Sequence, residues 1–547
     1  MATVGNCNDP ELRLLRYLYI GKEYPNYQPG YWFAHDYFIV RNVRSIEELA
    51  EEKEKELVPL ELITKAFEGK LITHPEALVF ALAVCCRQNK SEVLRQAAYK
   101  SVKTICASTP NFILFVKFAS KLCRENELNF VTQGWGQGLR KAINNWYLSK
   151  EPLDFVKCVM RYRSRYGWKH KDILKLAHPL GNSPASKIIL KYIIHGMEKT
   201  KAELEENHLT EDSDIKLILK YIENVESFKH CEDECQAASM LEMYELSLDH
   251  VPGHLLRSKE IWNSLISSMD VIMLLNNLQR IHNLGFLVSD EPAVEKVKDQ
   301  LTNEENIMCS EVHPALVFIT LKNYQCSGKS LTYEKRKVRE LAKKTLPPPY
   351  KPNDKIIDAL NTAFLLSFKN VQSTNLRYLV TISTHKNMEG RTWQNGNMTG
   401  IETASLIIML LLRSEENVDV VTFENNEIIK LEVNKTNSFE DILKVLKAIP
   451  LERTINMNKP ILWAKKQSEK YDVLINVIDQ IYPKYIECQE NLISYKTELK
   501  IPHARLITCA LCCSSPYRKF YDRYFLTING FDATVPKVIQ AFVQGLF

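Results

Sequence analysis

The sequence has no pattern typical of a signal peptide and no apolar run long enough to span a membrane. The N-terminal stretch from Met1 to Cys7 has no basic region followed by an apolar one, which argues against a signal peptide. The longest apolar run, Thr403 to Leu412, is shorter than the roughly 20 residues that span a bilayer, and we interpret it as a buried helix. We therefore expect a cytoplasmic protein that does not associate with membranes, with passage into the nucleus left open.

Disulfide and zinc-finger spacings are also missing, although the chain has 14 cysteines. Cys85 and Cys86 lie in an apolar run, where cysteine behaves as a small buried hydrophobic residue of a reducing compartment. Two later groups lack the second pair that a zinc site needs, and zinc is therefore disfavoured. These groups are Cys231 and Cys235 beside His230, and Cys509 with Cys512 and Cys513.

Catalytic signatures are absent as well. The chain contains no Gly-x-Ser-x-Gly, His-Glu-x-x-His or kinase motif. Gly328-Lys329-Ser330 resembles the end of a phosphate-binding loop, but Asn323 stands where that loop requires glycine. We expect no enzyme, with a nuclease built from scattered carboxylates as the open alternative. Because the net charge is only +5, any site for a polyanion must be a local patch.

Such a patch occupies residues 161–178, called the basic segment below. Guanidinium and ammonium groups bind phosphates, and the interleaved aromatic rings of Tyr162, Tyr166 and Trp168 can stack on unpaired bases. Two histidines, His170 and His178, join the group. The alternative is a solvated surface between two helices, with Trp168 as a core anchor. The basic side chains, set against the single acid Asp172, are Arg161, Arg163, Arg165, Lys169, Lys171 and Lys175.

The rhythm of apolar residues divides the chain in two. Up to about residue 370, apolar residues recur at helical spacing in one segment after another, beginning with Pro75–Cys86 and Ser91–Ala107. Serial helices without strands indicate an α-solenoid, of the loosely repeating HEAT-like type. A basic and proline-rich stretch, about 327–354, is interpreted as a connector. Buried strands then alternate with helices, which predicts a doubly wound α/β domain. The expected strands are Tyr378–Ile382, Val418–Phe423, Val473–Ile478 and Arg505–Leu511.

The motif Arg-Tyr-Arg-Ser-Arg-Tyr-Gly-Trp-x-His-Lys-Asp at the start of the basic segment, followed by an α/β domain, resembles the 60-kilodalton Ro autoantigen family. Members of that family join a TROVE module to a von Willebrand factor A-like domain. Trp135-Gly-x-Gly-Leu-Arg-Lys-Ala-Ile and Ser258-Lys-Glu-Ile-Trp262 support the resemblance. It implies a TROVE-like domain over residues 1–370, with HEAT-like helices closed into a ring, and an A-like domain over residues 371–547.

The resemblance further implies a small ribonucleoprotein for RNA quality control. Structured non-coding RNAs called Y RNAs would bind on the outer surface of the ring, and single-stranded 3′ ends of misfolded RNAs in its hole. We expect a monomer that does not bind DNA. The alternative from another class is a protein-interaction scaffold that uses the A-like domain and the solenoid surface. The resemblance implies RNA contacts at Arg161, Arg165 and His178, and Lys171, Arg140 and Lys141 lie in matching segments, although the last two could make ordinary surface ion pairs. The cluster of charge adds Arg163 and Lys169 to the candidate RNA-binding residues.

One family feature is degenerate. A-like domains often hold Mg²⁺ through oxygen ligands in an Asp-x-Ser-x-Ser loop, with a threonine and an aspartate from later loops. Here that loop supplies Ser383, His385 and Asn387, while Thr454 and Asp479 hold the later positions. One carboxylate with few hydroxyls is a poor Mg²⁺ site, so we predict that the metal is lost and that the chain has no cofactor. His385 and Asp479 would form a hydrogen-bonded pair in its place, or the loop residues would have no role.

Overall fold

The computed structural model describes residues 9–30, 32, 37–124, 134–162, 164–206, 212–288, 291–328, 350–425, 427–452, 455–481, 485–513 and 522–547. Most of the predicted connector, residues 329–349, lies outside these ranges. The chain forms two compact units, one from residues 38–268 and one from residues 1–37 with 269–547. Within the described ranges, no helix combines the length and apolarity needed to cross a bilayer.

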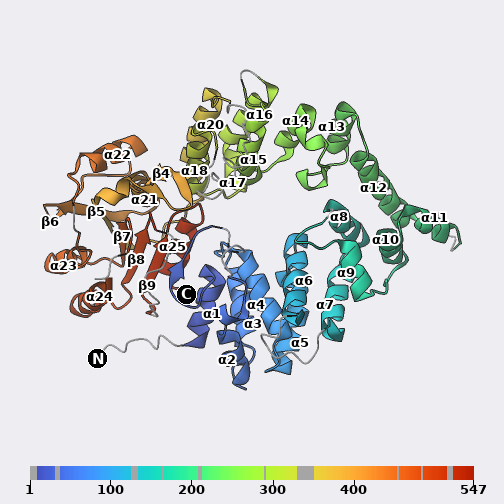
Figure 1. Ribbon diagram of the computed structural model, residues 1–547, viewed down its shortest axis with the longest axis horizontal. Helices are drawn as coiled ribbons and strands as arrows, with labels where there is room; N and C mark the ends of the chain where they lie inside the picture. The colour runs from blue at the N-terminus through green and yellow to red at the C-terminus, as the bar shows by residue number, and fades with distance from the viewer. Residues whose placement is uncertain are drawn as a thin grey trace, which may run out of the picture. The chain divides into compact units, whose positions relative to one another are not determined.

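The unit of residues 38–268 is helical, as the sequence predicts (Figure 1). The first predicted helices are confirmed almost residue for residue, because proline or serine marks their starts: Pro75 is the first residue of α4, and Ser91 caps α5 by accepting a hydrogen bond from the Leu94 amide. The helices are α2 (Ser45–Glu51), α3 (Val58–Glu68), α4 (Pro75–Arg87), α5 (Glu92–Ile105), α6 (Thr109–Arg124), α7 (Gly136–Leu148), α8 (Pro152–Arg161), α9 (His170–Ala177), α10 (Pro184–His195), α11 (Met197–Glu206), α12 (Ser213–Lys229), α13 (Glu234–Met243) and α14 (Lys259–Ser268).

The apolar run that contains Cys85 and Cys86 lies in the core of this unit. Every residue of α4 from Ala77 to Cys86 is at most 3% exposed, and this helix packs against α5 and α6. Burial raises the pKa of the Cys86 thiol well above its usual value, so this cysteine stays protonated. Stacked rings of Phe112 and Trp146, with centroids 3.7 Å apart, join α6 to α7. These contacts fix α7, on which α9 in turn packs.

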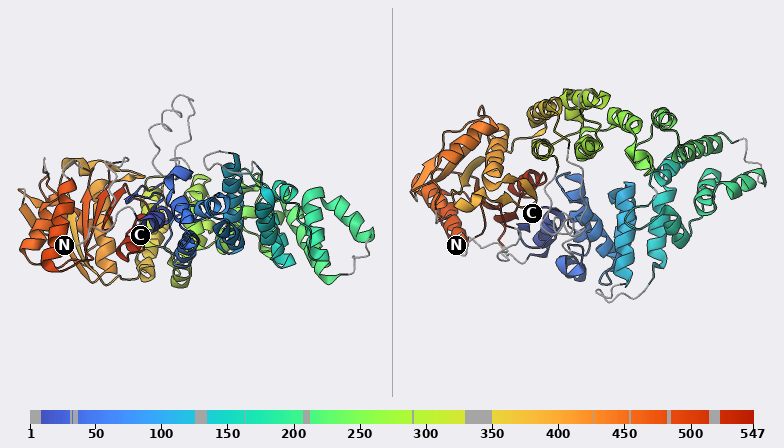
Figure 2. Two further views of the ribbon diagram at one scale, coloured as in Figure 1. Left: turned by 90° about the horizontal axis from the view of Figure 1, so that it is seen from below. Right: turned by 45° about the horizontal axis from the view of Figure 1, so that its top comes forward.

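The second unit combines helices with a seven-stranded sheet (Figures 1 and 2). Its helices are α1 (Pro10–Ile20), α15 (Val271–Asn283), α16 (Pro292–Thr302), α17 (Glu304–Cys309), α18 (Pro314–Gln325), α20 (Asp354–Ser367), α21 (Gly400–Ser414), α22 (Phe439–Ala448), α23 (Lys459–Lys466), α24 (Tyr485–Leu499) and α25 (Val535–Val543). Its strands are β1 (Asn26–Tyr27), β2 (Arg377–Ile382), β3 (Arg391–Thr392), β4 (Asn395–Thr399), β5 (Asn417–Glu424), β6 (Glu427–Lys430), β7 (Val473–Ile478), β8 (Arg505–Ala510) and β9 (Phe525–Asn529).

The sheet has the order β1-β9-β8-β7-β2-β5-β6, and only β6 runs antiparallel to its neighbour. Alternate side chains of β2 point to opposite faces: Leu379 packs in the core made with α23 and α24, whereas Tyr378 faces α21 and α25. From β2 the chain proceeds to β5 on one side and later to β7 on the other. The doubly wound fold is thus confirmed, with its switch point between β2 and β7.

The N-terminal segment belongs to this sheet, which the sequence did not indicate. Asn26 pairs with Thr527 and Tyr27 with Ile528, so that β1 extends the sheet beside β9. Helix α1 packs on α25, and the Arg16 guanidinium donates a hydrogen bond to the Asp522 carbonyl at 2.9 Å. A two-residue strand carries too little alternation to be recognised from its own sequence.

Candidate nucleic-acid interface

The first half of the basic segment contains a tight turn between helices α8 and α9. Helix α8 ends at Arg161, and Arg165 and Trp168 then exchange two backbone hydrogen bonds of 3.0 and 2.9 Å. The two residues between them, Tyr166 and Gly167, have φ angles of 51° and 84°, as a two-residue turn of the primed type requires. Glycine adopts this conformation without strain. The turn holds its cationic and aromatic side chains in fixed relation to one another.

Cations lie over the aromatic rings of this turn. The Arg165 guanidinium carbon is 5.2 Å from the centroid of the Tyr162 ring and 5.7 Å from that of Tyr166. The Arg161 guanidinium carbon is 5.4 Å from the Tyr162 ring, and Lys117 Nζ of α6 is 5.6 Å from the Tyr166 ring. These distances fall within the range of cation–π attraction. Cations placed in this way lose less side-chain entropy when they bind a phosphate, because their positions are already restricted.

Arg161 differs from Arg165 in having an acidic partner. Arg161 donates from Nε and Nη2 to Asp249 Oδ2 at 2.9 and 2.8 Å. The Arg161 side chain is 42% exposed and the Asp249 side chain 26%, so solvent screens the pair. No ion pair between Arg165 and another described residue accompanies it. Of these two arginines, Arg165 is therefore the one without an acidic partner among the described residues.

Helix α9 separates the rest of the basic segment into a buried and an exposed face. His170 is 4% exposed, and its Nδ1 makes a 2.7 Å hydrogen bond with the Tyr147 hydroxyl. Burial lowers the pKa of His170 to about 4, so the ring is neutral at physiological pH. His170 is thus a core residue and does not join the cationic group, contrary to the interpretation from sequence. Lys169, Lys171 and His178 are exposed.

His178 ends α9 in a left-handed conformation, with φ 51° and ψ 55°, while its amide donates to the Leu174 carbonyl at 3.0 Å. This position usually holds glycine or asparagine, because a Cβ makes the conformation costly. This backbone conformation sets the direction of the Cα–Cβ bond of His178, and its side chain is exposed. Its role as an RNA contact stays a prediction.

Two lysines outside the basic segment, Lys191 of α10 and Lys199 of α11, act on the same histidine as Lys171 and Lys175 of α9. Partial desolvation lowers the pKa of His195, at the end of α10, and the positive charges of four lysines lower it further. The lysines belong to three helices: Lys171 and Lys175 to α9, Lys191 to α10 and Lys199 to α11. Helix α10 packs against both α9 and α11, so these lysines lie on neighbouring helices. The basic surface therefore extends beyond the basic segment.

The predicted contacts of α7, Arg140 and Lys141, are both exposed. Neither makes an ion pair within the part of the chain that the structure describes, so the alternative of ordinary surface ion pairs finds no partner there. Lys141 lines a hollow of about 640 Å³ between α5, α7 and the end of α4, whereas Arg140 does not. Two predicted residues fall outside the described ranges: Arg163 of the basic segment and Thr454 of the degenerate metal loop.

The degenerate metal loop lies at the switch point of the sheet, at the carboxyl ends of β2 and β7. Ser383 follows β2 and Asp479 follows β7, and both are 1% exposed. Asp479 Oδ2 accepts a hydrogen bond from Asn387 Nδ2 at 3.1 Å and lies 3.4 Å from His385 Nδ1. The predicted residues are thus brought together. Nitrogen groups face the carboxylate oxygen that Mg²⁺ would need, so this donor set does not fit Mg²⁺. Loss of the metal stays a prediction.

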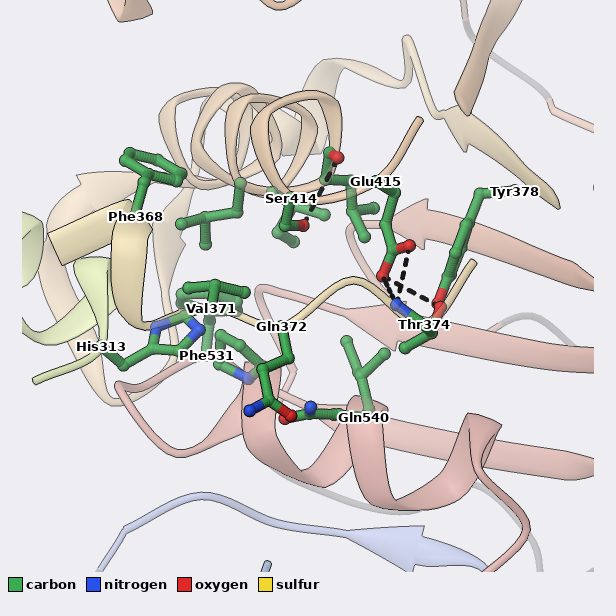
Figure 3. A pocket seen from close by; sticks show the side chains of 15 residues that line it. His313, Phe368, Val371, Gln372, Thr374, Tyr378, Ser414, Glu415, Phe531 and Gln540 are labelled. Atoms are coloured by element: carbon green, nitrogen blue, oxygen red, sulfur yellow. Dashed lines mark hydrogen bonds between the residues drawn. The ribbon is translucent and has the colours of Figure 1, made fainter. Parts of the chain in front are cut away.

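A further cavity lies at the other end of the same sheet, between α21, α25 and the start of β2 (Figure 3). Its walls are mostly apolar, and its carboxylate, Glu415, accepts hydrogen bonds from Thr374 N, Thr374 Oγ1 and Ser373 Oγ at 2.8–3.0 Å. Its described lining residues include no lysine or arginine. This cavity therefore lacks the chemistry of a phosphate site.

Comparison with known proteins agrees with this arrangement. A family model described as the TROVE domain matches residues 51–326, and one described as the Ro60 vWA domain matches residues 377–543. The chain is 24% identical, over 595 aligned residues, to the "RNA-binding protein RO60" of Caenorhabditis elegans; the alignment covers 98% of this chain and 88% of the relative. The protein of the same name from Deinococcus radiodurans is 24% identical over 480 residues, covering 86% and 81% of the two chains. The crystal structure of the Deinococcus radiodurans Ro (Rsr) protein superposes with a TM-score of 0.81 at 21% identity, covering 98% of this chain and 100% of the other.

Proposed function

The chain belongs to the Ro60 family, which joins a TROVE domain to a vWA domain, and on that premise we propose that it binds RNA without catalysing a reaction. Two relatives that match most of its length are named RNA-binding proteins. Their names apply to them, and the proposal for this chain rests on its own residues as well.

One observation carries the proposal: the turn of the basic segment holds Arg165 between the rings of Tyr162 and Tyr166, beside exposed lysines of α9. Restricted cations bind phosphates, and aromatic rings accept unpaired bases. Helix α10 packs on α9 and on α11, and lysines of α10 and α11 add further positive charge beside α9. Charged residues are depleted in the cores of protein interfaces, so the concentration of cations on these neighbouring helices favours RNA over a protein partner.

The proposed ligands are structured small non-coding RNAs of the Y RNA kind and the single-stranded 3′ ends of misfolded RNAs. RNA is commonly recognised through its shape and its unpaired segments, which suits a protein that sorts RNAs by whether a free end is present. We place the protein in the cytoplasm, as a monomer that takes part in small-RNA quality control.

Binding of the purified protein to a structured small RNA, with and without a free 3′ tail, over a range of salt concentrations tests the proposal. We expect tail-dependent binding that weakens steeply with salt, because phosphate contacts release counterions. Absence of binding to either RNA at low salt would overturn it. In that case a pull-down of partners that resists ribonuclease would support the protein-scaffold alternative.

A further inference from the structure

The hollow beside Lys141 has the size and lining of a ligand site. Its volume of about 640 Å³ lies within the range of roughly 300–1,000 Å³ that small-molecule sites occupy. Helix α5, the first turns of α7 and the end of α4 form its walls. The side chains that matter below are Arg87, Arg95, Tyr99, Lys100, Trp135 and Lys141.

Positive charge dominates this lining. Four basic side chains face a single carboxylate, that of Glu92, among the described lining residues. Glu92 already pairs with Arg95 one turn along α5, and its Oε1 accepts a hydrogen bond from Gln96 Nε2 at 2.9 Å. Lys100 and Lys141 are exposed, on helices that face each other across the hollow. The hollow therefore attracts anions.

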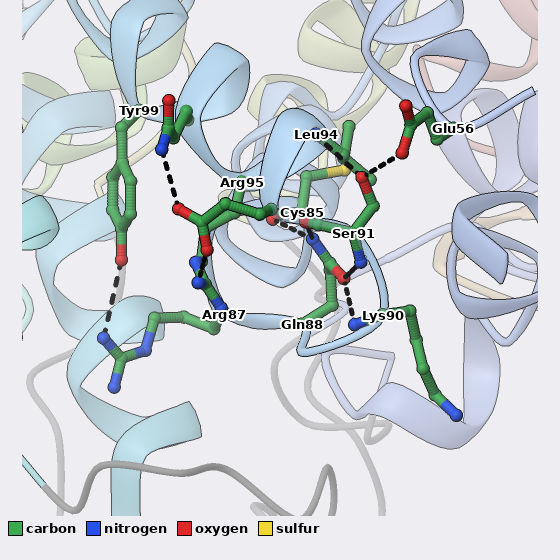
Figure 4. A network of polar contacts seen from close by, with 11 residues as sticks. Glu56, Cys85, Arg87, Gln88, Lys90, Ser91, Leu94, Arg95 and Tyr99 are labelled. Carbon is green, nitrogen blue, oxygen red and sulfur yellow. Dashed lines mark hydrogen bonds and ion pairs between the residues drawn. The ribbon is translucent and has the colours of Figure 1, made fainter. Parts of the chain in front are cut away.

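Arg87 links the Tyr99 side chain to the backbone of residues 134 and 135 beside the hollow. Its side chain lies at the end of α4, and the residue is 7% exposed. Nη1 donates to the Tyr99 hydroxyl at 3.5 Å and to the Trp135 carbonyl at 3.4 Å, and Nη2 donates to the Gly134 carbonyl at 3.0 Å. Figure 4 shows the Tyr99 ring with its hydroxyl directed at this guanidinium. A buried cation thus contacts the Tyr99 hydroxyl and the backbone that leads into Trp135, and adds positive charge at the base of the hollow.

Close packing keeps Tyr99 in place and connects the hollow to the basic segment. A Cβ on Gly138 of α7 would lie 2.7 Å from a carbon of the Tyr99 ring, so the absence of a side chain lets α7 approach this ring. On the other side, the rings of Trp135 and Trp168 are 5.7 Å apart. Trp168 closes the turn that carries Arg165. An RNA at that turn is therefore next to the hollow.

We propose that this hollow binds one unpaired nucleotide of an RNA held at the basic segment, with its base against Tyr99 and Trp135 and its phosphate against Lys100 and Lys141. The inference rests on the proposed function and adds a site to it. Aromatic rings stack on any base whose face is free, whereas bases inside a duplex are covered by their neighbours. The occupant is consequently a nucleotide of a single-stranded segment and not part of a helix.

Two RNA hairpins of identical stem, one blunt and one with a single-stranded uridine tail, test the proposal on the full chain. The double variant Lys100→Ala, Lys141→Ala should weaken binding of the tailed hairpin about tenfold at moderate salt, since two phosphate contacts are lost. Binding of the blunt hairpin should change less than about twofold. A matched control, Lys65→Ala with Lys103→Ala, removes the same charge from exposed positions of α3 and α5 that do not line the hollow.

Equal effects of the two double variants, or equal weakening of both hairpins, would overturn the inference while leaving RNA binding intact. Failure of the unmodified protein to bind either hairpin would instead overturn the proposed function. Crosslinking gives a second readout that needs no variant: a tail carrying 4-thiouridine, irradiated in the complex, should attach to Tyr99 or Trp135. Attachment only to other peptides would contradict the assignment.

Discussion

Arg165→Ala should reduce the salt dependence of RNA binding more than Arg161→Ala does. Both guanidinium groups lie against the Tyr162 ring, at 5.2 and 5.4 Å. Arg161 also bonds to Asp249 at 2.8 and 2.9 Å, whereas Arg165 has no acidic partner among the described residues. A cation that already has a carboxylate neighbour gains less from a phosphate, because it must share its charge or exchange one partner for the other.

The expected size of the effect follows from counterion release. One phosphate contact contributes about 0.9 to the slope of log affinity against log salt for a duplex, and about 0.7 for a single strand. Loss of the Arg165 contact should therefore make the fall in affinity between about 50 and 200 mM salt roughly threefold smaller. Arg161→Ala should change the slope by less than half as much. Asp249→Asn removes the competing charge and should restore to Arg161 the full effect of one contact.

Fluorescence anisotropy of a labelled structured small RNA, titrated at several salt concentrations, measures these slopes. Arg161→Ala, Asp249→Asn and their combination form a double-mutant cycle that isolates the influence of the pair. An unchanged slope for Arg165→Ala would remove this residue from the interface. An effect of Asp249→Asn that persists without Arg161 would show that the carboxylate repels the RNA by itself, and the argument from the ion pair would be wrong.

Three further outcomes can be checked on the same protein. His178→Ser should weaken a structured RNA more than a bare single strand in the anisotropy assay, and equal weakening would place His178 outside the contact with structured RNA. Calorimetry should detect no Mg²⁺ or Mn²⁺ binding tighter than about 1 mM, and a stronger signal would contradict the loss of the metal. Burial lowers the pKa of His170 to about 4 in the folded protein, whereas in the unfolded chain the pKa of histidine is about 6.5. As pH falls, the unfolded chain is therefore protonated at His170 before the folded protein is. The contribution of the neutral ring to the free energy of unfolding is complete above about pH 6.5 and is lost towards pH 4. Between pH 7 and pH 5 this loss is about 2 kcal/mol, and the free energy of unfolding of His170→Gln, measured by urea denaturation, should lack that part of the pH dependence. An identical pH dependence in the variant would show that burial does not lower the pKa of His170 in this way.

Local sequence signals were sufficient for most elements of the fold, because each signal acts within a few residues. Pro75 and Ser91 mark helix starts, and the run Val473–Ile478 coincides with β7 residue for residue. The signals failed where an element depends on a distant partner. Strand β1 exists because Asn26 and Tyr27 meet β9, about five hundred residues later in the chain, and Asn529 Nδ2 donates to Asn26 Oδ1 across that separation. No pattern within residues 26 and 27 could reveal this pairing.

The same distinction applies to the candidate interface. Composition drew attention to the basic segment, and the exposed Lys169, Lys171 and His178 are consistent with that interpretation. Composition could not predict that His170 points into the core or that Arg161 pairs with Asp249, because both contacts depend on residues of other elements. The lysines of α10 and α11 escaped notice for this reason too. They are isolated in sequence and gather only when the helices pack.

The degenerate metal loop shows the opposite case, in which local sequence carries nearly all of the argument. Strands β2 and β7 still bring Asp479 to the switch point, so the scaffold of the site is intact. The change lies in the loop after β2, where Asn387 donates to Asp479 Oδ2 from its side chain and to His385 Nδ1 from its backbone, at 3.1 and 3.3 Å. A cation that entered would have to displace the amide group from the carboxylate and would find nitrogen donors in place of the hydroxyl oxygens. If the metal is lost, as we predict, restoring its site would require new side chains at residues 383, 385 and 387, with no change to the sheet that presents them.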